Sequence, residues 1–164
     1  MLIEILKRTP PWVFVLFFVL LALGYSQSKE RAVKRGSVSV LPIAMIALSF
    51  YSVFSAFGIA PIGFIFWLIG GGAAVLLGLV LTAPRGVRYS TETQLYLVPG
   101  SWLPLVLIMI IFFIRYYVGY AFARQLSIAG EPAFIGSISF CYGLFSGLFF
   151  ARAMVIWRSA KAYQ

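Results

Sequence analysis

The sequence predicts an all-α integral membrane protein, a polytopic helical bundle with five transmembrane helices in a single membrane domain. Of the 164 residues, 62% are hydrophobic and only 10% are charged, and the apolar residues gather in five runs separated by Gly, Pro or basic residues. About 20 apolar helical residues cross the ~30 Å hydrocarbon core of a bilayer. The expected spans are residues 12–25, 38–57, 62–81, 103–123 and 134–153.

Each run is expected to be a helix, because the runs lack the alternation of apolar and polar residues that is typical of barrel strands. Pro10 and Pro11 precede the first run, where a missing backbone N–H costs little. This run resembles a signal peptide, since Lys7 and Arg8 come before it, but the basic residues that follow it directly favour an uncleaved helix. Residues 58–61 form a tight turn, so the second and third spans are predicted to be antiparallel neighbours.

The longest connection, residues 82–101, follows the third span. We expect an ordered surface loop here, and a short interfacial helix capped near Ser90 is the alternative. Residues 99–104 are a proline-containing entry to the fourth span, and the fifth span is followed by a cationic tail. The connection 82–101 and the C-terminal tail are both too short to form a water-soluble domain.

The basic residues predict the orientation of the bundle. Lys and Arg in short loops are retained on the cytoplasmic side of a membrane. One end of the predicted bundle carries Lys29, Arg31, Lys34, Arg35, Arg85, Arg88, Arg152, Arg158 and Lys161, and the other carries only Lys7, Arg8 and Arg124. We therefore expect an inner-membrane protein with its N-terminus outside and its C-terminus in the cytoplasm. On this view the basic residues behind the net charge of +9 set the orientation of the helices and contact anionic lipid headgroups, and they do not bind nucleic acid.

Several kinds of chemistry lack their residues. The chain has no histidine, its one cysteine is Cys141 in the fifth span, and Glu4, Glu30, Glu92 and Glu131 all lie outside the spans. An intramolecular disulfide, a histidine-ligated metal or haem, a carboxylate proton relay and a Ser-His-Asp triad are therefore excluded. We expect a protein that is not an enzyme and that holds no cofactor and no metal.

Arg115 is the only charged residue predicted to lie inside a span and away from its ends, since Arg152 falls at the cytoplasmic end of the fifth span. A central arginine costs on the order of 3 kcal/mol on insertion scales, so it marks a site unless its side chain snorkels to the interface. The candidate ligand-binding set joins Arg115 to Tyr116 and Tyr120 on the same helix and to Tyr51 and Tyr142. The last two belong to polar strips on the second and fifth spans: Ser49, Tyr51, Ser52 and Ser55, and Ser139, Cys141, Tyr142 and Ser146. With no intramembrane carboxylate to pair with Arg115, its expected partner is a backbone carbonyl, a tyrosine hydroxyl, or an anionic group such as a lipid phosphate or a carboxylate ligand.

Small residues recur every four positions on two spans, which places them on one face of each helix. The third span carries Gly70, Ala74 and Gly78, and the fifth carries Ser139, Gly143, Gly147 and Ala151. Such faces allow close backbone approach. They serve either packing within one subunit or contact with a second copy or another membrane protein.

Three segments, Leu6–Val13, Leu41–Ser52 and Ser55–Gly58, resemble a family of small uncharacterised bacterial inner-membrane proteins of about this length. The resemblance implies no activity and no site residues. From the residues themselves we expect a protein that binds or conducts a small anionic or amphipathic molecule or a lipid. The alternative is an accessory or scaffold subunit that docks another membrane protein through its small-residue faces.

Overall fold

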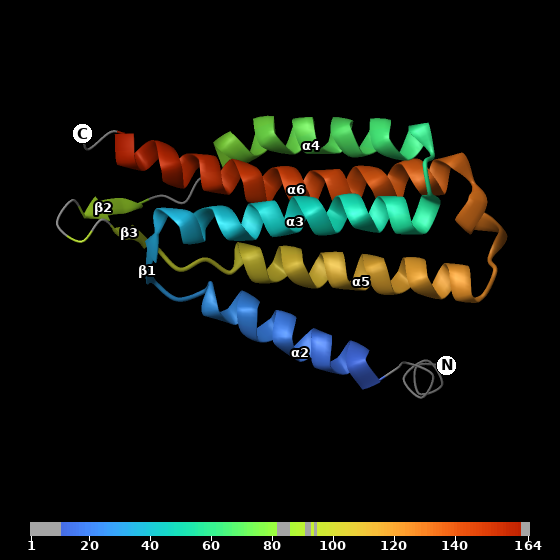
Figure 1. The fold of residues 1–164 in the computed structure, drawn as a ribbon, viewed down its shortest axis with the longest axis horizontal. Coiled ribbons are helices and arrows are strands. Elements are labelled where there is room, and N and C mark those ends of the chain that lie inside the picture. The colour runs from blue at the N-terminus through green and yellow to red at the C-terminus, as the bar shows by residue number, and fades with distance from the viewer. Residues whose placement is uncertain (1–10, 82–85, 91–92, 94, 162–164) are drawn as a thin grey trace.

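The structure, a computed structural model that describes residues 11–81, 86–90, 93 and 95–161, is a bundle of long helices with a small sheet at one end (Figure 1). The helices are α2 (Pro11–Ser26), α3 (Arg35–Phe57), α4 (Pro61–Leu81), α5 (Leu103–Ala123) and α6 (Pro132–Lys161), with a 3-10 helix η1 (Ser127–Gly130) before α6. The strands are β1 (Arg31–Lys34), β2 (Arg88–Ser90) and β3 (Leu95–Val98).

The prediction of an all-α helical bundle is confirmed, whereas the count of five transmembrane helices is not. Four helices, α3 to α6, are long and apolar enough to cross a membrane. The apolar segment of α2, Val13–Ser26, is shorter. At 16 residues, α2 extends about 24 Å, less than the ~30 Å of a hydrocarbon core.

Prolines mark the helix starts. Pro11, Pro61 and Pro132 are the first residues of α2, α4 and α6, and Pro104 is the second residue of α5. A proline at these positions removes an N–H that no helical carbonyl would accept, and its fixed φ suits the first turn. Between α3 and α4 the chain reverses through Gly58, whose φ of +63° is in the region that favours glycine.

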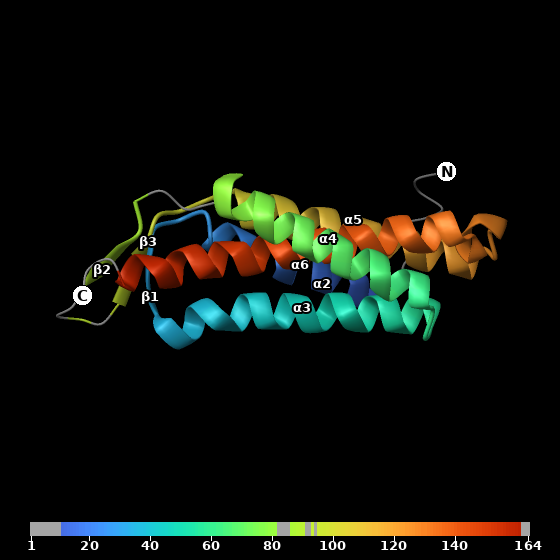
Figure 2. The same ribbon diagram turned by 90° about the horizontal axis from the view of Figure 1, so that it is seen from above.

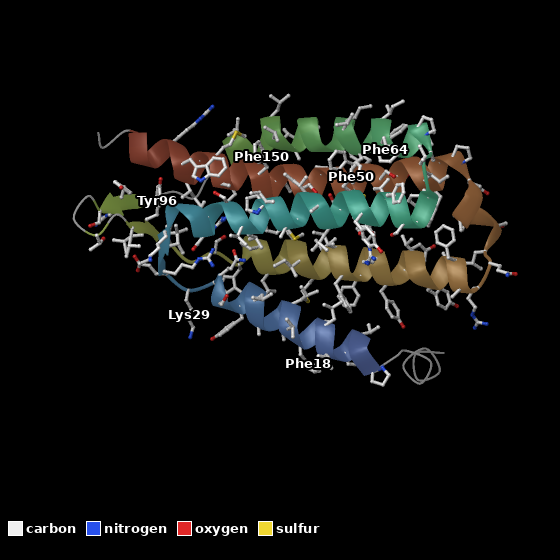
Figure 3. All side chains as sticks on the ribbon, in the orientation of Figure 1. Phe18, Lys29, Phe50, Phe64, Tyr96 and Phe150 are labelled. Carbon is white, nitrogen blue, oxygen red and sulfur yellow. The ribbon has the colours of Figure 1, made fainter. Side chains whose placement is uncertain are left out.

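Helix α6 lies at the centre of the bundle, with its most extensive contact against α4 and a second contact against α3 (Figures 1 and 2). Helix α2 packs on α5, at the opposite side of the bundle from α4. The outer faces are apolar: Val15 and Phe18 on α2 are both 64% exposed, and Figure 3 shows Phe18 projecting away from the other helices. An exposed apolar surface of this extent is expected where lipid covers the protein.

The sheet at the end of the bundle was not predicted. Its strands run in the order β1-β3-β2, all antiparallel, with Arg31 opposite Val98 and Tyr89 opposite Tyr96. Tyr96 is buried against Ile156 of α6 and anchors the sheet to the bundle. The predictions of a loop or an interfacial helix for residues 82–101 are therefore wrong for 88–90 and 95–98. Three or four residues carry too little periodicity to indicate a strand, and β1 pairs with a segment more than sixty positions away.

Candidate functional site

Polar side chains from four helices meet inside the bundle. Ser49 and Ser52 are three residues apart on α3, and Tyr142 and Ser146 are four apart on α6, so each pair lies on one helix face. All four are buried. Because α3 packs against α6, the buried members of the two predicted polar strips lie near one another, whereas Tyr51 and Ser55 are exposed.

One part of this polar interior is a closed, neutral network. The Ser146 hydroxyl donates to the Ser49 hydroxyl at 2.6 Å, and the Trp67 indole N–H of α4 donates to the same oxygen at 3.1 Å. The Ser49 hydroxyl in turn lies 3.0 Å from the carbonyl of Ile46. These contacts join α3, α4 and α6, and a network whose donors and acceptors are all used has a structural role.

The second part of the polar interior surrounds the guanidinium of Arg115. Its guanidinium donates to the Ser52 hydroxyl, which donates to the carbonyl of Leu48 at 2.6 Å, and it interacts with the hydroxyl of Tyr142. The side chain therefore extends from α5 toward both α3 and α6. Counted at 1.5 Å per residue, Arg115 lies about 18 Å from the sheet-side end of α5 and about 12 Å from the other end.

The charge of Arg115 has only neutral partners. Within the described part of the chain, no carboxylate forms an ion pair with it; Glu30 is exposed near β1, and Glu131 is exposed before α6. A serine and a tyrosine hydroxyl satisfy guanidinium N–H groups without cancelling the charge. Arg115 is itself exposed at the surface of the bundle, so a ligand anion can approach it from the lipid side.

The structure separates the predicted ligand-binding residues. Tyr142 meets Arg115, whereas Tyr51 is 59% exposed and is turned about 100° from the adjacent Ser52 around α3. The ring of Tyr120 lies 5.7 Å from the guanidinium of Arg124. Tyr116 is half-buried on α5. Ser52 was predicted only as part of a polar strip. The sequence did not indicate its contact with Arg115, because the two residues are 63 positions apart.

The small-residue faces pack against each other within the chain. A Cβ on Gly70 would overlap the carbonyl of Phe140, and one on Gly143 would overlap the carbonyl of Trp67. A Cβ on Gly147 would overlap the carbonyl of Gly71. The remaining members of both faces are also buried: Ala74, Gly78, Ser139 and Ala151. Backbone contact between α4 and α6 therefore accounts for these faces.

Two buried groups have no evident role in packing. The hydroxyl of Ser139 is fully buried and finds no hydrogen-bond partner in the residues described. Arg152 of α6 is only 8% exposed and faces Arg31 of β1, although the sequence predicted it merely as an interfacial cation. No cluster of three or more potential metal-ligating residues occurs in the described ranges, and Cys141 is a half-buried free thiol.

A family model described as a family of unknown function (DUF6622) matches residues 1–164. This match confirms the resemblance to an uncharacterised family of about this length. No curated protein and no solved structure matches the chain.

Proposed function

We infer a function for this chain, which belongs to DUF6622, a family of unknown function, from its apolar helices and from the charge of Arg115. The protein is an integral membrane protein that binds a small anionic amphiphile, such as a lipid with a phosphate or carboxylate group. Arg115 holds the anionic group, and Tyr142 and Ser52 orient the guanidinium. The observation that carries this proposal is a cation within a membrane helix whose hydrogen-bond partners are neutral.

Arg115 has no counter-charge among the residues that the structure describes. An arginine inside the hydrocarbon region is costly, and proteins retain one where it meets an anion, water or a functional partner. Removing a charge from water is offset only when an opposite charge and further hydrogen bonds replace the hydration. An anionic group beside Arg115 supplies both, and the apolar faces around it suit acyl chains.

The orientation belongs to the same proposal. We place the sheet end of the bundle in the cytoplasm of a bacterial cell and the N-terminus outside, with α2 as a fifth crossing. The basic residues near the sheet support this side, since they include Lys29, Arg31, Lys34, Arg88 and Arg158. Anionic headgroups of that leaflet are the expected lipid partners of these cations.

Native mass spectrometry of the full chain released from nanodiscs tests the anion site. We expect the wild-type protein to retain an anionic amphiphile and Arg115→Gln to lose it, with about a tenfold fall in retention. Arg115→Lys should also lose retention, because a lysine cannot reproduce the paired hydrogen bonds of a guanidinium.

Arg124→Gln is the matched control, since Arg124 is a second arginine at the end of the same helix and lies over Tyr120 instead. It should retain the amphiphile as the wild type does. Equal retention in wild type, Arg115→Lys and Arg115→Gln would overturn the anion site and leave Arg115 as a snorkelling anchor. The scaffold alternative has less support, because the small-residue faces that it requires are covered by α4 and α6 themselves.

A further inference from the structure

A cavity of about 110 Å³ lies at the sheet end of the bundle, the end where Figure 3 labels Tyr96 and Lys29. Its polar lining comes from four segments: Gln27 after α2, Arg31 of β1, Ser37 of α3 and Arg152 of α6. A single water molecule needs only about 10–15 Å³ of such space, so the cavity holds several waters or one tetrahedral oxyanion.

The fold fixes each arginine in place. In β1, residues alternate between half-buried and exposed, so Arg31 and Val33 share the face toward the bundle while Lys34 points away. Pairing of Arg31 with Val98 of β3 holds this register. Arg152 is 8% exposed, on a helix that packs along α4 and α3. Both guanidinium groups are therefore directed into the cavity by secondary structure.

Gln27 adds an oriented donor. It is 7% exposed, and its side-chain oxygen accepts a hydrogen bond from the Arg31 guanidinium at 3.1 Å. Because the oxygen is used in this way, the amide nitrogen of Gln27 is left with its two N–H donors. The backbone carbonyl of Gln27 accepts from the N–H of Ser101 at 3.0 Å, so the residue is held from both sides.

The two arginines repel each other and have no counter-charge within the described residues. Arg31 and Arg152 are close enough to interact electrostatically. Burial lowers the pKa of Arg31, although a guanidinium stays charged at neutral pH. No glutamate forms an ion pair with either one in the residues that the structure describes. An anion between the two guanidinium groups offsets their repulsion and supplies the missing counter-charge.

We propose that this cavity binds a phosphate group, with Arg31 and Arg152 as its two cationic donors and Gln27 and Ser37 as neutral donors. A phosphomonoester carries nearly two negative charges and has several acceptor oxygens, which matches two guanidinium groups better than a singly charged carboxylate does. The phosphate belongs either to a soluble molecule or to a lipid headgroup, because Arg152 lies about 30 Å along α6 from Pro132, at interface depth. This site is separate from Arg115, which lies within its span.

Titration of the full chain in nanodiscs of phosphatidylcholine alone tests the soluble source, with inorganic phosphate and glycerol 3-phosphate as the probes. Nanodiscs that also contain phosphatidic acid or phosphatidylglycerol test the lipid source, with retained lipid measured by native mass spectrometry. We expect saturable binding in at least one arm, with phosphatidic acid, a phosphomonoester, retained over phosphatidylglycerol, a phosphodiester.

Arg31→Gln and Arg152→Gln should each weaken that binding about tenfold or more. Lys34→Gln is the matched control, because it removes one positive charge from the same strand on the face that points away. If Arg152→Gln does not fold, Arg31→Gln alone tests whether the cavity binds phosphate. Absence of binding to folded wild-type protein in both arms, or an equal loss in Lys34→Gln, would overturn the proposal.

Discussion

At the scale of single residues, Gly143 sets the distance between α4 and α6. No side chain separates its α-carbon from the carbonyl of Trp67, and the backbone N–H of Gly71 lies on the same side. In a membrane, where the hydrophobic effect does not drive helices together, such close packing supplies much of the attraction. The contact therefore stabilises the most extensive helix–helix packing of the bundle, between α4 and α6.

We expect Gly143→Ala to lower the free energy of unfolding by about 1–3 kcal/mol, because even a methyl group forces the two backbones apart. Gly72→Ala is the control: Gly72 is in α4, the helix that Gly143 of α6 contacts, but a Cβ there meets nothing within 4 Å, so the change should be within about 0.5 kcal/mol. Unfolding by denaturing detergent, followed by circular dichroism, measures both. The assignment fails if the two variants unfold at the same detergent concentration.

The arginines show which parts of a site a sequence can predict. The sequence predicts Arg115 as a site residue, because a charged residue within an apolar run can be recognised from the order of the residues alone. Its contact with Ser52 was not predicted, since helix rotation and the packing of α5 near α3 decide which serine it reaches. Arg31 and Arg152 were interpreted as orientation signals, because their facing geometry depends on a strand whose existence the sequence did not indicate.

At the scale of elements, the junction between α2 and α5 depends on a close contact outside the helices. A Cβ on Gly100 would overlap the carbonyl of Ser28, and the following N–H, from Ser101, donates to Gln27. The ring of Tyr25 lies 6.1 Å from that of Trp102. Helix α2 makes its main contact with α5, so this junction determines how firmly α2 is attached.

Gly100→Ala should therefore loosen α2 while leaving α4 and α6 packed. Hydrogen exchange followed by mass spectrometry should show faster exchange in residues 13–26 and unchanged exchange in residues 61–81. In Gly36→Ala, a substitution with open space around it, both segments should exchange at the wild-type rate. Uniformly faster exchange across all helices in Gly100→Ala would contradict a local role for the junction.

The elements also differ in how far they could be predicted. The five predicted runs correspond to α2 through α6, and the ends of α5 match at residues 103 and 123. Length and apolarity are local properties, and proline marks the starts. Helix α6 extends to Lys161, past the predicted end of the membrane span near residue 153, which agrees with the prediction that the cationic tail continues the last helix; the sheet packs on this part through Ile156. That contact, like the sheet itself, is a tertiary effect that no local pattern contains.

At the scale of the whole molecule, the structure makes the orientation testable with two exposed positions at opposite ends. Ala32 lies on the outward face of β1, and Ser127 begins η1. In a Cys141→Ser background, Ser127→Cys should react with an impermeant thiol reagent on intact cells, and Ala32→Cys should react only after the membrane is opened. Labelling in the reverse order would place the sheet outside the cell.

Pairing of β1 with β3 imposes an order on biosynthesis. Arg31 leaves the ribosome 67 residues before its partner Val98, a delay of roughly 3–13 s at ordinary rates of translation. Helices α3 and α4 are both synthesised in that interval, so β1 has no strand partner until β3 is synthesised. Charged side chains discourage the pairing of an unpaired strand with other chains. Three such residues lie in or next to β1: Lys29, Arg31 and Lys34. The basic residues that support the proposed orientation thus also discourage wrong pairing of β1 before β3 is synthesised.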